Sequence, residues 1–364
     1  MLPGDYWQLL SENRFRIHPT RYPMTGIIAC WTILNVGLTG IQWLVHQNKI
    51  ESTTIEQPPI FIVGHWRSGT TLLHELLSLD EQLSFPSNFD AFVPHHFLVS
   101  GPLFRPILQL LLPNKRPMDD MSVGVDSPQE DDFALMLLGG PAHYRHMGFP
   151  QLDQNYERYL DVENLESDES SELKSQMTYF MKALTYKYKQ RLILKSPPHT
   201  GRIRALADWF PGAKFVHISR HPTKIVPSTM RLWKLVHDVH GFQLPRYSEQ
   251  ELFDYVNRCQ KIMYSAYNRD AMGLPGDQLA EVSFEQLVSQ PGDTIRSIYR
   301  KLNLDNADKV AGSAEAYLDE KKDHKKNKYD FSRYTADIEA NWSDYMNQFG
   351  YSQSSSQQSS EFAP

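Results

Sequence analysis

The stretch from Ile60 to Leu79 constrains the fold more than any other part of the chain. The apolar run Ile60-Phe61-Ile62-Val63 is followed directly by Gly64-His65-Trp66-Arg67-Ser68-Gly69-Thr70-Thr71 and then by a leucine-rich segment. A short continuous apolar run is typical of a buried parallel strand, and the leucines predict a helix. Two glycines at this spacing predict a loop whose backbone N–H groups converge on a phosphate at the N-terminus of the helix.

Further apolar runs repeat this pattern along the chain, at 191–194, 214–218 and 279–282. Helices are expected after them, at 202–210, from Pro222 onward, and at 283–288, where Pro291-Gly292 interrupts the pattern. Proline is favoured in the first turn of a helix. Strands that alternate with helices predict an α/β fold. We expect a P-loop-like domain of three layers, with a central, mostly parallel sheet flanked by helices, preceded by an N-terminal helical segment.

The composition changes along the chain predict its domain organisation. Residues 1–58 are expected to form the N-terminal helical segment and a linker, and residues 59–350 the main domain. Within that domain, residues 85–172 are irregular and rich in proline and histidine, which favours an insertion on the acceptor side of the site. Residues 351–364 are rich in serine and glutamine and are expected to be a disordered tail.

The segment from Gly26 to Val45 carries no charge and is about as long as a bilayer is thick. Its threonines, glycines, Asn35 and Gln42 favour a helix packed on the domain, or lying on a membrane surface, over a true span. The charged residues before it predict that no cleavable signal peptide is present. The two cysteines form no CxxC pair, which favours a reducing compartment. We therefore expect a cytoplasmic protein, with membrane association through 26–45 left open.

The overall composition excludes some classes of protein. A net charge of −6 argues against a general nucleic-acid binder, and 41% hydrophobic residues describe an ordinary globular protein. Histidines occur in pairs, at His95-His96 and at His143 and His146, within the irregular insertion. We expect these side chains to be packed or to face the substrate, and we predict no metal site.

The residues of the phosphate loop indicate which ligand it suits. A nucleoside triphosphatase has lysine and then serine or threonine after the second glycine, where this chain has Thr70 and Thr71. The basic residue is instead Arg67, inside the loop. This arrangement favours a single phosphate that carries one transferable group. The candidate binding residues are Arg67, Ser68, Gly69, Thr70, Thr71 and Leu72.

A second candidate anion site follows the run Phe215-Val216-His217-Ile218-Ser219. Arg220 comes directly after this predicted strand, and Ser228 lies two turns into the helix expected after Pro222. A strand end that presents arginine and a helix that presents serine can hold a second phosphate between them. An arginine at a sheet edge and a serine on a helix are also common without a ligand.

Together these two motifs resemble the sulfotransferase superfamily over residues 60–288, and most closely its broad bacterial branch with RSGTT and LKSPxH patterns. The resemblance implies 3′-phosphoadenosine 5′-phosphosulfate as co-substrate and transfer of its sulfuryl group to a hydroxyl or amine. It implies that the loop binds the 5′-phosphosulfate, and that Arg220 and Ser228 bind the 3′-phosphate. Lys195 matches the family's catalytic lysine, and Arg67 is expected to assist it. Such a reaction depends mainly on positioning and on neutralising charge.

Two further donor contacts are implied by the resemblance. Phe284 matches an element near the nucleotide base, although tyrosine is usual there, so that a hydroxyl contact is lost and stacking remains. Lys325, in the basic run 321–328, occupies about the position of the family's C-terminal phosphate-binding loop. A solvated charge run is the alternative for Lys325.

The general base has three candidates. His199 matches the bacterial KxPxH pattern and is the first choice. Asp90 is the second, because it lies near the position of the glutamate that serves tyrosylprotein sulfotransferases. Glu130, in the run Glu130-Asp131-Asp132, is the third, and a helix start is its alternative role.

Two rival functions and several acceptors stay open at this point. The rivals are a P-loop kinase or nucleotidase that uses ATP, and a non-catalytic, membrane-associated nucleotide-binding protein. The acceptor can be a small molecule, a lipid or a carbohydrate, and the apolar segment 85–112 favours a lipid-like, steroid-like or glycolipid acceptor. The sequence leaves the oligomeric state undecided.

Overall fold

A parallel β-sheet forms the centre of the molecule. The computed structural model describes residues 1–111, 124–151, 155–320 and 334–352. In these residues five strands pair in the order β2-β3-β1-β4-β5, with all neighbours parallel. Their bounds are β1 Ile60–Val63, β2 Leu83–Ser84, β3 Arg191–Lys195, β4 Lys214–Ser219 and β5 Leu279–Ser283. The predicted parallel sheet is confirmed; β2 was missed because a strand of two residues has no readable pattern.

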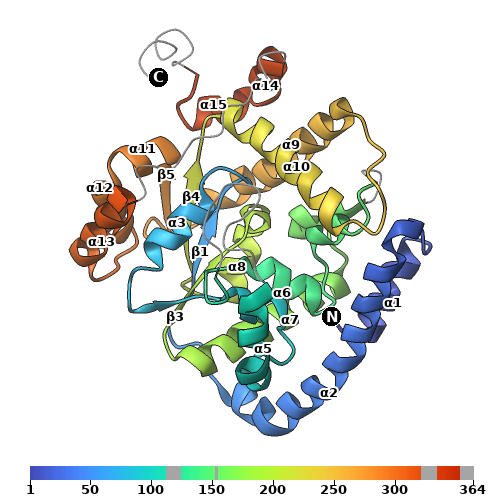
Figure 1. Cartoon of the computed structure of the whole chain (residues 1–364). Coiled ribbons are helices and arrows are strands. Elements are labelled where there is room, and N and C mark those ends of the chain that lie inside the picture. Colours follow the sequence, from blue (N-terminus) through green and yellow to red (C-terminus); the bar gives the residue numbers. More distant parts are fainter. Residues whose placement is uncertain (112–123, 152–154, 321–333, 353–364) are drawn as a thin grey trace.

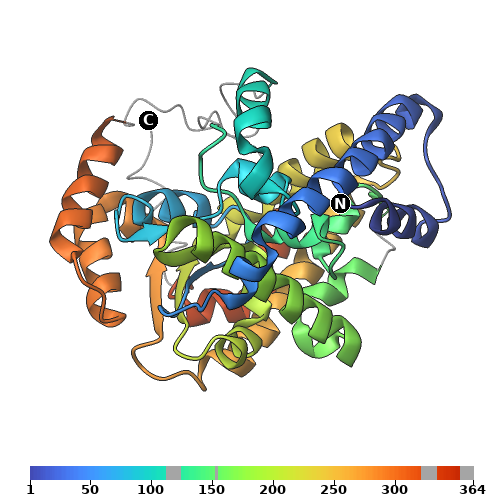
Figure 2. The same ribbon diagram turned by 90° about the horizontal axis from the view of Figure 1, so that it is seen from below.

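Helices cover both faces of the sheet, because alternate strand residues point to opposite sides. Ile62 and Val216 face one apolar cluster, and Phe61 and Phe215 face another. The first cluster is closed by α3 (Thr70–Leu77), α12 (Pro291–Lys301) and α13 (Ala307–Glu320). The second is closed by α7 (Ser167–Tyr188), α8 (Ile203–Trp209), α9 (Pro222–His240) and α10 (Glu249–Ala271). Figures 1 and 2 show the resulting three layers, which confirm the predicted fold class.

The N-terminal segment is helical, as predicted. It consists of α1 (Pro3–Glu12) and the long α2 (Tyr22–Ser52), which packs against α1, α7 and α5 (Phe97–Leu111) along one side of the domain. By length and composition, α2 is apolar enough to cross a membrane. The expected insertion is more helical than its sequence suggested, since it also holds α4 (Asn88–Phe92) and α6 (Asp131–Leu137).

The remaining helices are short. Within the described residues they include α11 (Phe284–Ser289), α14 (Thr335–Asn341), α15 (Ser343–Gln348) and 3₁₀ turns at Pro19–Arg21, His143–Met147, Asn155–Leu160, Val162–Asn164 and Pro197–Gly201. The last of these follows β3 directly and leads the chain from Lys195 to α8. The C-terminal helices α14 and α15 lie near the carboxyl ends of the strands in Figure 1. Tyr351, which we expected in the tail, is buried against this end of the domain.

Candidate active site

The predicted phosphate loop joins β1 to α3 and has the backbone that its glycines allow. Gly64 and Gly69 have φ values of 143° and 108°, which side chains rarely permit. A Cβ atom on Gly64 would lie 2.6 Å from the carbonyl oxygen of Ile218, and one on Gly69 would lie 2.4 Å from the ring of Phe284. Both glycines are therefore required by close packing as well as by conformation.

Hydrogen bonds fix the shape of this loop. The Gly64 N–H donates to Thr200 Oγ1 at 2.8 Å, which ties the loop to the segment after β3. The Ser68 hydroxyl donates to the His65 carbonyl at 2.7 Å and is buried within the loop. Thr70 is buried at the start of α3, while Thr71 and Leu72 are partly exposed. The loop is thus held in its curved form by contacts of its own and by Thr200.

The second predicted anion site lies against the first. Arg67 Nε donates to Ser228 Oγ at 2.9 Å, and Arg220 Nη1 donates to the carbonyl oxygen of Arg67 at 3.1 Å. The Arg220 guanidinium also lies 4.0 Å from the centre of the Phe284 ring. The loop, the residue after β4, α9 and α11 therefore bring Arg67, Arg220, Ser228 and Phe284 together.

The Arg220 guanidinium is largely buried and lies near the positive charge of Arg67. Burial lowers its pKa below the usual range, Glu285 opposes this shift, and the nearby positive charge of Arg67 adds to it. Its Nε atom is buried and has no hydrogen-bond partner within the described residues. A buried charged donor without a partner is costly, and a bound anion would supply the missing acceptor.

Lys195 lies at the carboxyl end of β3, beside Ile62 of β1 and so next to the loop. Its ammonium group donates to Glu130 Oε1 at 2.7 Å, with the lysine side chain 3% exposed and the glutamate 15%. The Tyr144 hydroxyl donates to the other carboxylate oxygen of Glu130, and Trp66 Nε1 donates to the Tyr144 oxygen at 3.0 Å. Burial, followed by the charge of Glu130, raises the Tyr144 pKa well above its usual value, so this hydroxyl stays protonated.

The three acidic residues that begin with Glu130 form ion pairs, in chain order, with Lys195 at the end of β3 and with two residues of the segment after it. Glu130 binds Lys195, Asp131 Oδ2 lies 2.8 Å from His199 Nε2, and Asp132 binds Arg202. The last two pairs are buried, and the His199 ring packs edge-on against Phe61 in the core. Glu130 is also the N-cap of α6, as its alternative role at a helix start predicted. It therefore both precedes a helix and contacts Lys195.

Asp90 lies at the start of α4, where it is bound by other groups. It accepts from Lys187 Nζ and from the Tyr188 hydroxyl, each at 2.6 Å, and its carboxylate is fully buried. It also accepts from the Ser87 N–H, in the manner of a capping box. Lys325, the candidate from the C-terminal basic run, lies outside the described residues.

The paired histidines are buried and hydrogen-bonded. His95 binds the Leu137 carbonyl, His96 binds Asn35 and Ser100, His143 binds the Tyr156 carbonyl and Tyr255, and His146 binds His237. No group of three His, Cys, Asp or Glu side chains suited to a metal ion occurs in the part of the chain that the structure describes.

The C-terminal helices supply contacts that the sequence analysis missed. The Arg220 N–H donates to the Tyr345 hydroxyl at 3.1 Å, and this hydroxyl donates back to the Arg220 carbonyl at 3.2 Å. The Tyr351 hydroxyl donates to Glu285 at 2.9 Å. The aromatic residues at 342, 345, 349 and 351, in an otherwise polar segment, were the available signal.

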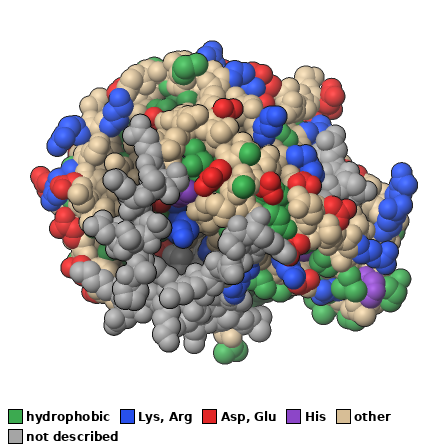
Figure 3. All heavy atoms as spheres, turned by 90° about the horizontal axis from the view of Figure 1, so that it is seen from above, with side chains coloured by type: hydrophobic (Ala, Val, Ile, Leu, Met, Phe, Trp, Pro, Cys, Tyr) green, Lys and Arg blue, Asp and Glu red, His purple; other side chains and the backbone are tan. Residues whose placement is uncertain are grey.

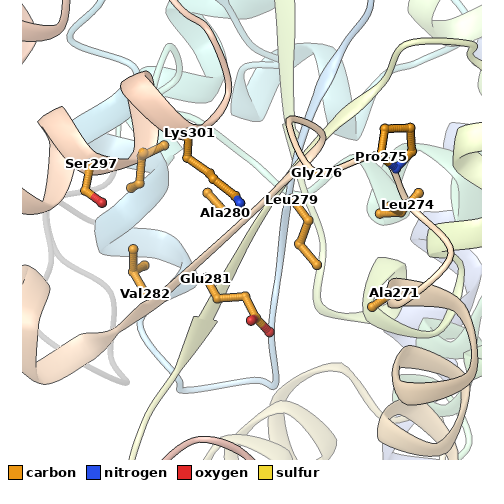
Figure 4. A pocket seen from close by; sticks show the side chains of 11 residues that line it. Ala271, Leu274, Pro275, Gly276, Leu279, Ala280, Glu281, Val282, Ser297 and Lys301 are labelled. Atoms are coloured by element: carbon orange, nitrogen blue, oxygen red, sulfur yellow. The ribbon is translucent and has the colours of Figure 1, made fainter.

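The site lies at the carboxyl ends of the strands, on the side of the molecule from which Figure 3 is viewed. A separate open cavity of about 420 Å³ lies along β5, and Figure 4 shows the side chains that line it, including Glu281 and Lys301. None of the predicted site residues lines this cavity. The carboxylate of Glu281, which lines this cavity, accepts a hydrogen bond from the Tyr267 hydroxyl at 2.6 Å.

Sequence comparison places this chain among known enzymes. A model of the sulfotransferase family matches residues 58–308. Proteins named Omega-hydroxy-beta-dihydromenaquinone-9 sulfotransferase Stf3, from Mycobacterium bovis and Mycobacterium tuberculosis, are 33% identical over 347 residues. The match covers 95% of this chain and 89% of each relative.

Solved structures share the fold. Sulfotransferase STF9 from Mycobacterium avium superposes with a TM-score of 0.67 at 18% identity, covering 86% of this chain and 81% of STF9. Sulfotransferase STF1 from Mycobacterium tuberculosis H37Rv has a TM-score of 0.60 at 15% identity, covering 95% of this chain and 93% of STF1. Neither a kinase nor a non-catalytic binding protein agrees with these relatives. The chain belongs to the sulfotransferase family and is an enzyme that transfers a sulfuryl group.

Proposed function

We propose that the enzyme transfers the sulfuryl group of 3′-phosphoadenosine 5′-phosphosulfate to the hydroxyl of a lipid acceptor. The assignment of the sulfuryl donor rests on the convergence of Arg67, Arg220 and Ser228 at the phosphate loop. Hydrogen bonds of 2.9 and 3.1 Å join these residues. The loop would take the 5′-phosphosulfate, and Arg220 with Ser228 the 3′-phosphate. Two adjacent anion sites suit a nucleotide with phosphates at both ends of its ribose.

The details of the donor site fit this ligand. The orphaned Nε of Arg220 offers a donor to a phosphate oxygen, and charge-assisted bonds of this kind are the stronger hydrogen bonds. The backbone at Gly69 leaves no space for a side chain, because the Phe284 ring fills it. We therefore assign Phe284 to supporting the loop and Arg220, in place of the stacking role expected from its sequence.

We propose that Glu130 is the general base. It contacts Lys195 directly, and it is more exposed than Asp131 or Asp90, which are buried in other pairs. In the step we envisage, the acceptor hydroxyl gives its proton to the Glu130 carboxylate while its oxygen forms a bond to sulfur. The bond from sulfur to the bridging oxygen breaks, and the phosphate leaves with that electron pair. Lys195 and Arg67 would neutralise the developing negative charge.

His199, our first choice from the sequence, receives a different role in this proposal. Its ring is fully buried and bound to Asp131, while Thr200, the next residue, holds the Gly64 N–H. We propose that His199 positions the segment after β3, including Lys195, and that Asp90 supports α4. Neither side chain has the exposure that contact with an acceptor requires.

The lipid acceptor is supported by the apolar side chains around Glu130. Phe133 lies 4.8 Å from the ring of Tyr144 and 5.9 Å from that of Phe92, which is 39% exposed. The relatives of 33% identity are named for a hydroxylated menaquinone, which is a lipid with a terminal hydroxyl. We propose a hydroxylated, membrane-dwelling acceptor and an enzyme that works at the cytoplasmic surface of a membrane.

Calorimetry with 3′-phosphoadenosine 5′-phosphate, AMP and ATP tests the donor. We expect the 3′-phosphorylated nucleotide to bind best, and Arg220→Ala to weaken it by about 1.5–3 kcal/mol, the value of a charge-assisted bond. Arg204→Ala is the matched control, because Arg204 is an exposed arginine paired only with its helical neighbour Asp208 in the bonds described. Equal binding of AMP would contradict the donor assignment, and preference for ATP would favour kinase chemistry.

A second assay tests the acceptor. The enzyme is incubated with donor labelled in the sulfuryl group and with separate lipid and polar extracts. We expect label in the lipid extract only, at a hydroxyl. Label confined to polar products would overturn the lipid proposal while leaving the donor proposal intact.

A further inference from the structure

In helix α2, polar side chains are buried against the domain and large apolar side chains are exposed. Its buried side chains are Thr32, Asn35 and Gln42, which are polar and at most 4% exposed, and Ile50 near its C-terminal end. Its exposed side chains are large and apolar, and they include Ile27 at 70%, Ile33 at 66%, Trp43 at 60% and Leu44 at 76%. A soluble surface helix has the reverse pattern. No Asp, Glu, Lys or Arg occurs between Arg21 and Lys49 to interrupt this face.

The apolar face continues onto α5. Trp31 of α2 contacts Phe104 of α5, with ring centres 5.3 Å apart. Beyond this contact, α5 exposes Leu103 at 61% and Ile107 at 48%. We call the exposed apolar side chains of α2 and α5 the apolar face. Large contiguous apolar surfaces of this kind mark binding sites for membranes or other proteins.

The N-terminal end of the apolar face has the residues of a membrane interface. Trp7, Phe15 and Tyr22 are exposed at 65%, 45% and 59%. Arg14 and Arg16 are exposed beside them. Figure 3 shows hydrophobic and basic side chains together at this lower right corner of the molecule. Exposed aromatic rings favour the level of the lipid headgroups, and arginines favour anionic ones.

The polar contacts of α2 show how it can meet a bilayer. Asn35 binds the carbonyl of Met1 and the ring of His96, each at 3.0 Å. Gln42 donates to the Tyr179 hydroxyl and accepts from the Leu98 N–H. These bonds attach α2 to α1, α5 and α7, so the helix cannot cross a bilayer without drawing the domain in with it. It can only lie in the plane of the interface.

We infer that the apolar face docks on the surface of an anionic bilayer, with α2 parallel to the membrane and its Arg14 end among the headgroups. The inference rests on the proposed function in one respect. Docking would bring the enzyme to the membrane, in which the proposed lipid acceptor dissolves. A link to the site exists, because α5 packs on α4 and α4 packs on α6, whose N-cap is Glu130.

Vesicle flotation of the full chain, without donor or acceptor, tests the inference. We expect the protein to float with vesicles of equal parts phosphatidylcholine and phosphatidylglycerol, and at least tenfold less with phosphatidylcholine alone. The double variant Trp43→Ser with Leu44→Ser should lose at least tenfold in vesicle affinity. Met272→Ser is the matched control, because Met272 is an apolar side chain 88% exposed on another part of the molecule. Binding of 3′-phosphoadenosine 5′-phosphate should be unchanged in all variants, which separates this test from that of the proposed function.

The two cysteines allow the orientation to be measured. Cys30 is exposed on α2 and Cys259 is buried, so an environment-sensitive fluorophore attaches at Cys30. We expect stronger quenching by lipids that carry the quencher near the headgroup than by lipids that carry it at the chain end. Stronger quenching from the chain end would indicate a span and overturn the inference. So would a failure to float, or a vesicle-free dimer that the double variant abolishes.

Discussion

At the scale of single residues, Glu130 and Lys195 form an ion pair in which the lysine side chain is 3% exposed and the glutamate side chain is 15% exposed. Attraction between opposite charges is strong there, so both groups are held in position at the mouth of the phosphate loop. Tyr144 fixes the second oxygen of the carboxylate and Trp66 fixes Tyr144. The carboxylate is therefore oriented from both sides before any acceptor arrives.

Glu130→Gln tests the role of this carboxylate in the proposed step. The amide keeps the shape and can still accept a bond from Lys195, but it cannot take a proton. We expect kcat to fall about 10²- to 10⁴-fold, as for loss of a general base, with nucleotide affinity changed less than about twofold. Single-turnover rates and calorimetry measure the two quantities. If Glu130→Gln lost as much nucleotide affinity as His199→Asn, the result would indicate a structural role for Glu130 instead.

The contrast between the proposed donor site and the proposed base shows which residues could be predicted from the sequence. Arg67 and Arg220 each follow a strand, and Ser228 lies in the helix that follows Arg220. Parallel strands bring such positions to one edge of the sheet. Glu130 has no such guide, because its partner Lys195 lies 65 residues away across an insertion of unknown path. The acidic run at 130–132 and the basic residues at 195, 199 and 202 pair in order, but only coordinates reveal the register.

At the scale of elements, α2 was predicted as a helix, but its orientation was not. Sequence alone showed an apolar run with a few polar residues, and packing usually buries the apolar part. Here the polar residues Asn35 and Gln42 are buried because α1, α5 and α7 offer them hydrogen-bond partners. Four of the five described strands, in contrast, were predicted to within one residue, because a short buried apolar run is typical of a parallel strand.

Gln42→Leu tests whether these polar contacts hold α2 on the domain. In a helix with an ordinary orientation, leucine at a buried position would stabilise the fold. In α2 it removes the acceptor of the Leu98 N–H and the partner of Tyr179, and we expect a loss of about 1–3 kcal/mol in the free energy of unfolding. Denaturant unfolding measures it, with the exposed Leu44→Gln as control. A more stable Gln42→Leu would contradict the orientation of α2.

At the scale of the whole molecule, many imidazoles are buried without charge. Burial lowers the pKa of His65 and His237 to about 4, and that of His143 and His217 to about 3. In the unfolded chain these groups titrate near 6.5. Below pH 6.5 the unfolded state therefore binds more protons than the folded state, so the stability falls as the pH falls.

We expect acid unfolding to begin near pH 6 and to be complete before pH 4. At pH 5 each such histidine removes up to about 2 kcal/mol, so the four together remove up to about 8 kcal/mol, which is comparable to the total of about 5–15 kcal/mol typical of a folded protein. Melting temperatures between pH 7.5 and 4.5 measure this loss. His217→Gln should reduce the slope with pH by about one proton. A melting temperature that stays constant down to pH 4.5 would refute the expectation.

The hydroxyl of Tyr345 binds both the N–H and the carbonyl of Arg220, and Tyr351 binds Glu285 beside it. The proposed donor site is therefore completed by residues close to the C-terminal end of the described chain, although its loop follows the first strand. During synthesis on the ribosome, these contacts to Arg220 and Glu285 cannot form until Tyr345 and Tyr351 have emerged. A nascent or prematurely ended chain would expose this cationic pocket unfinished, and we expect such products to be recognised by proteases before they can bind nucleotide.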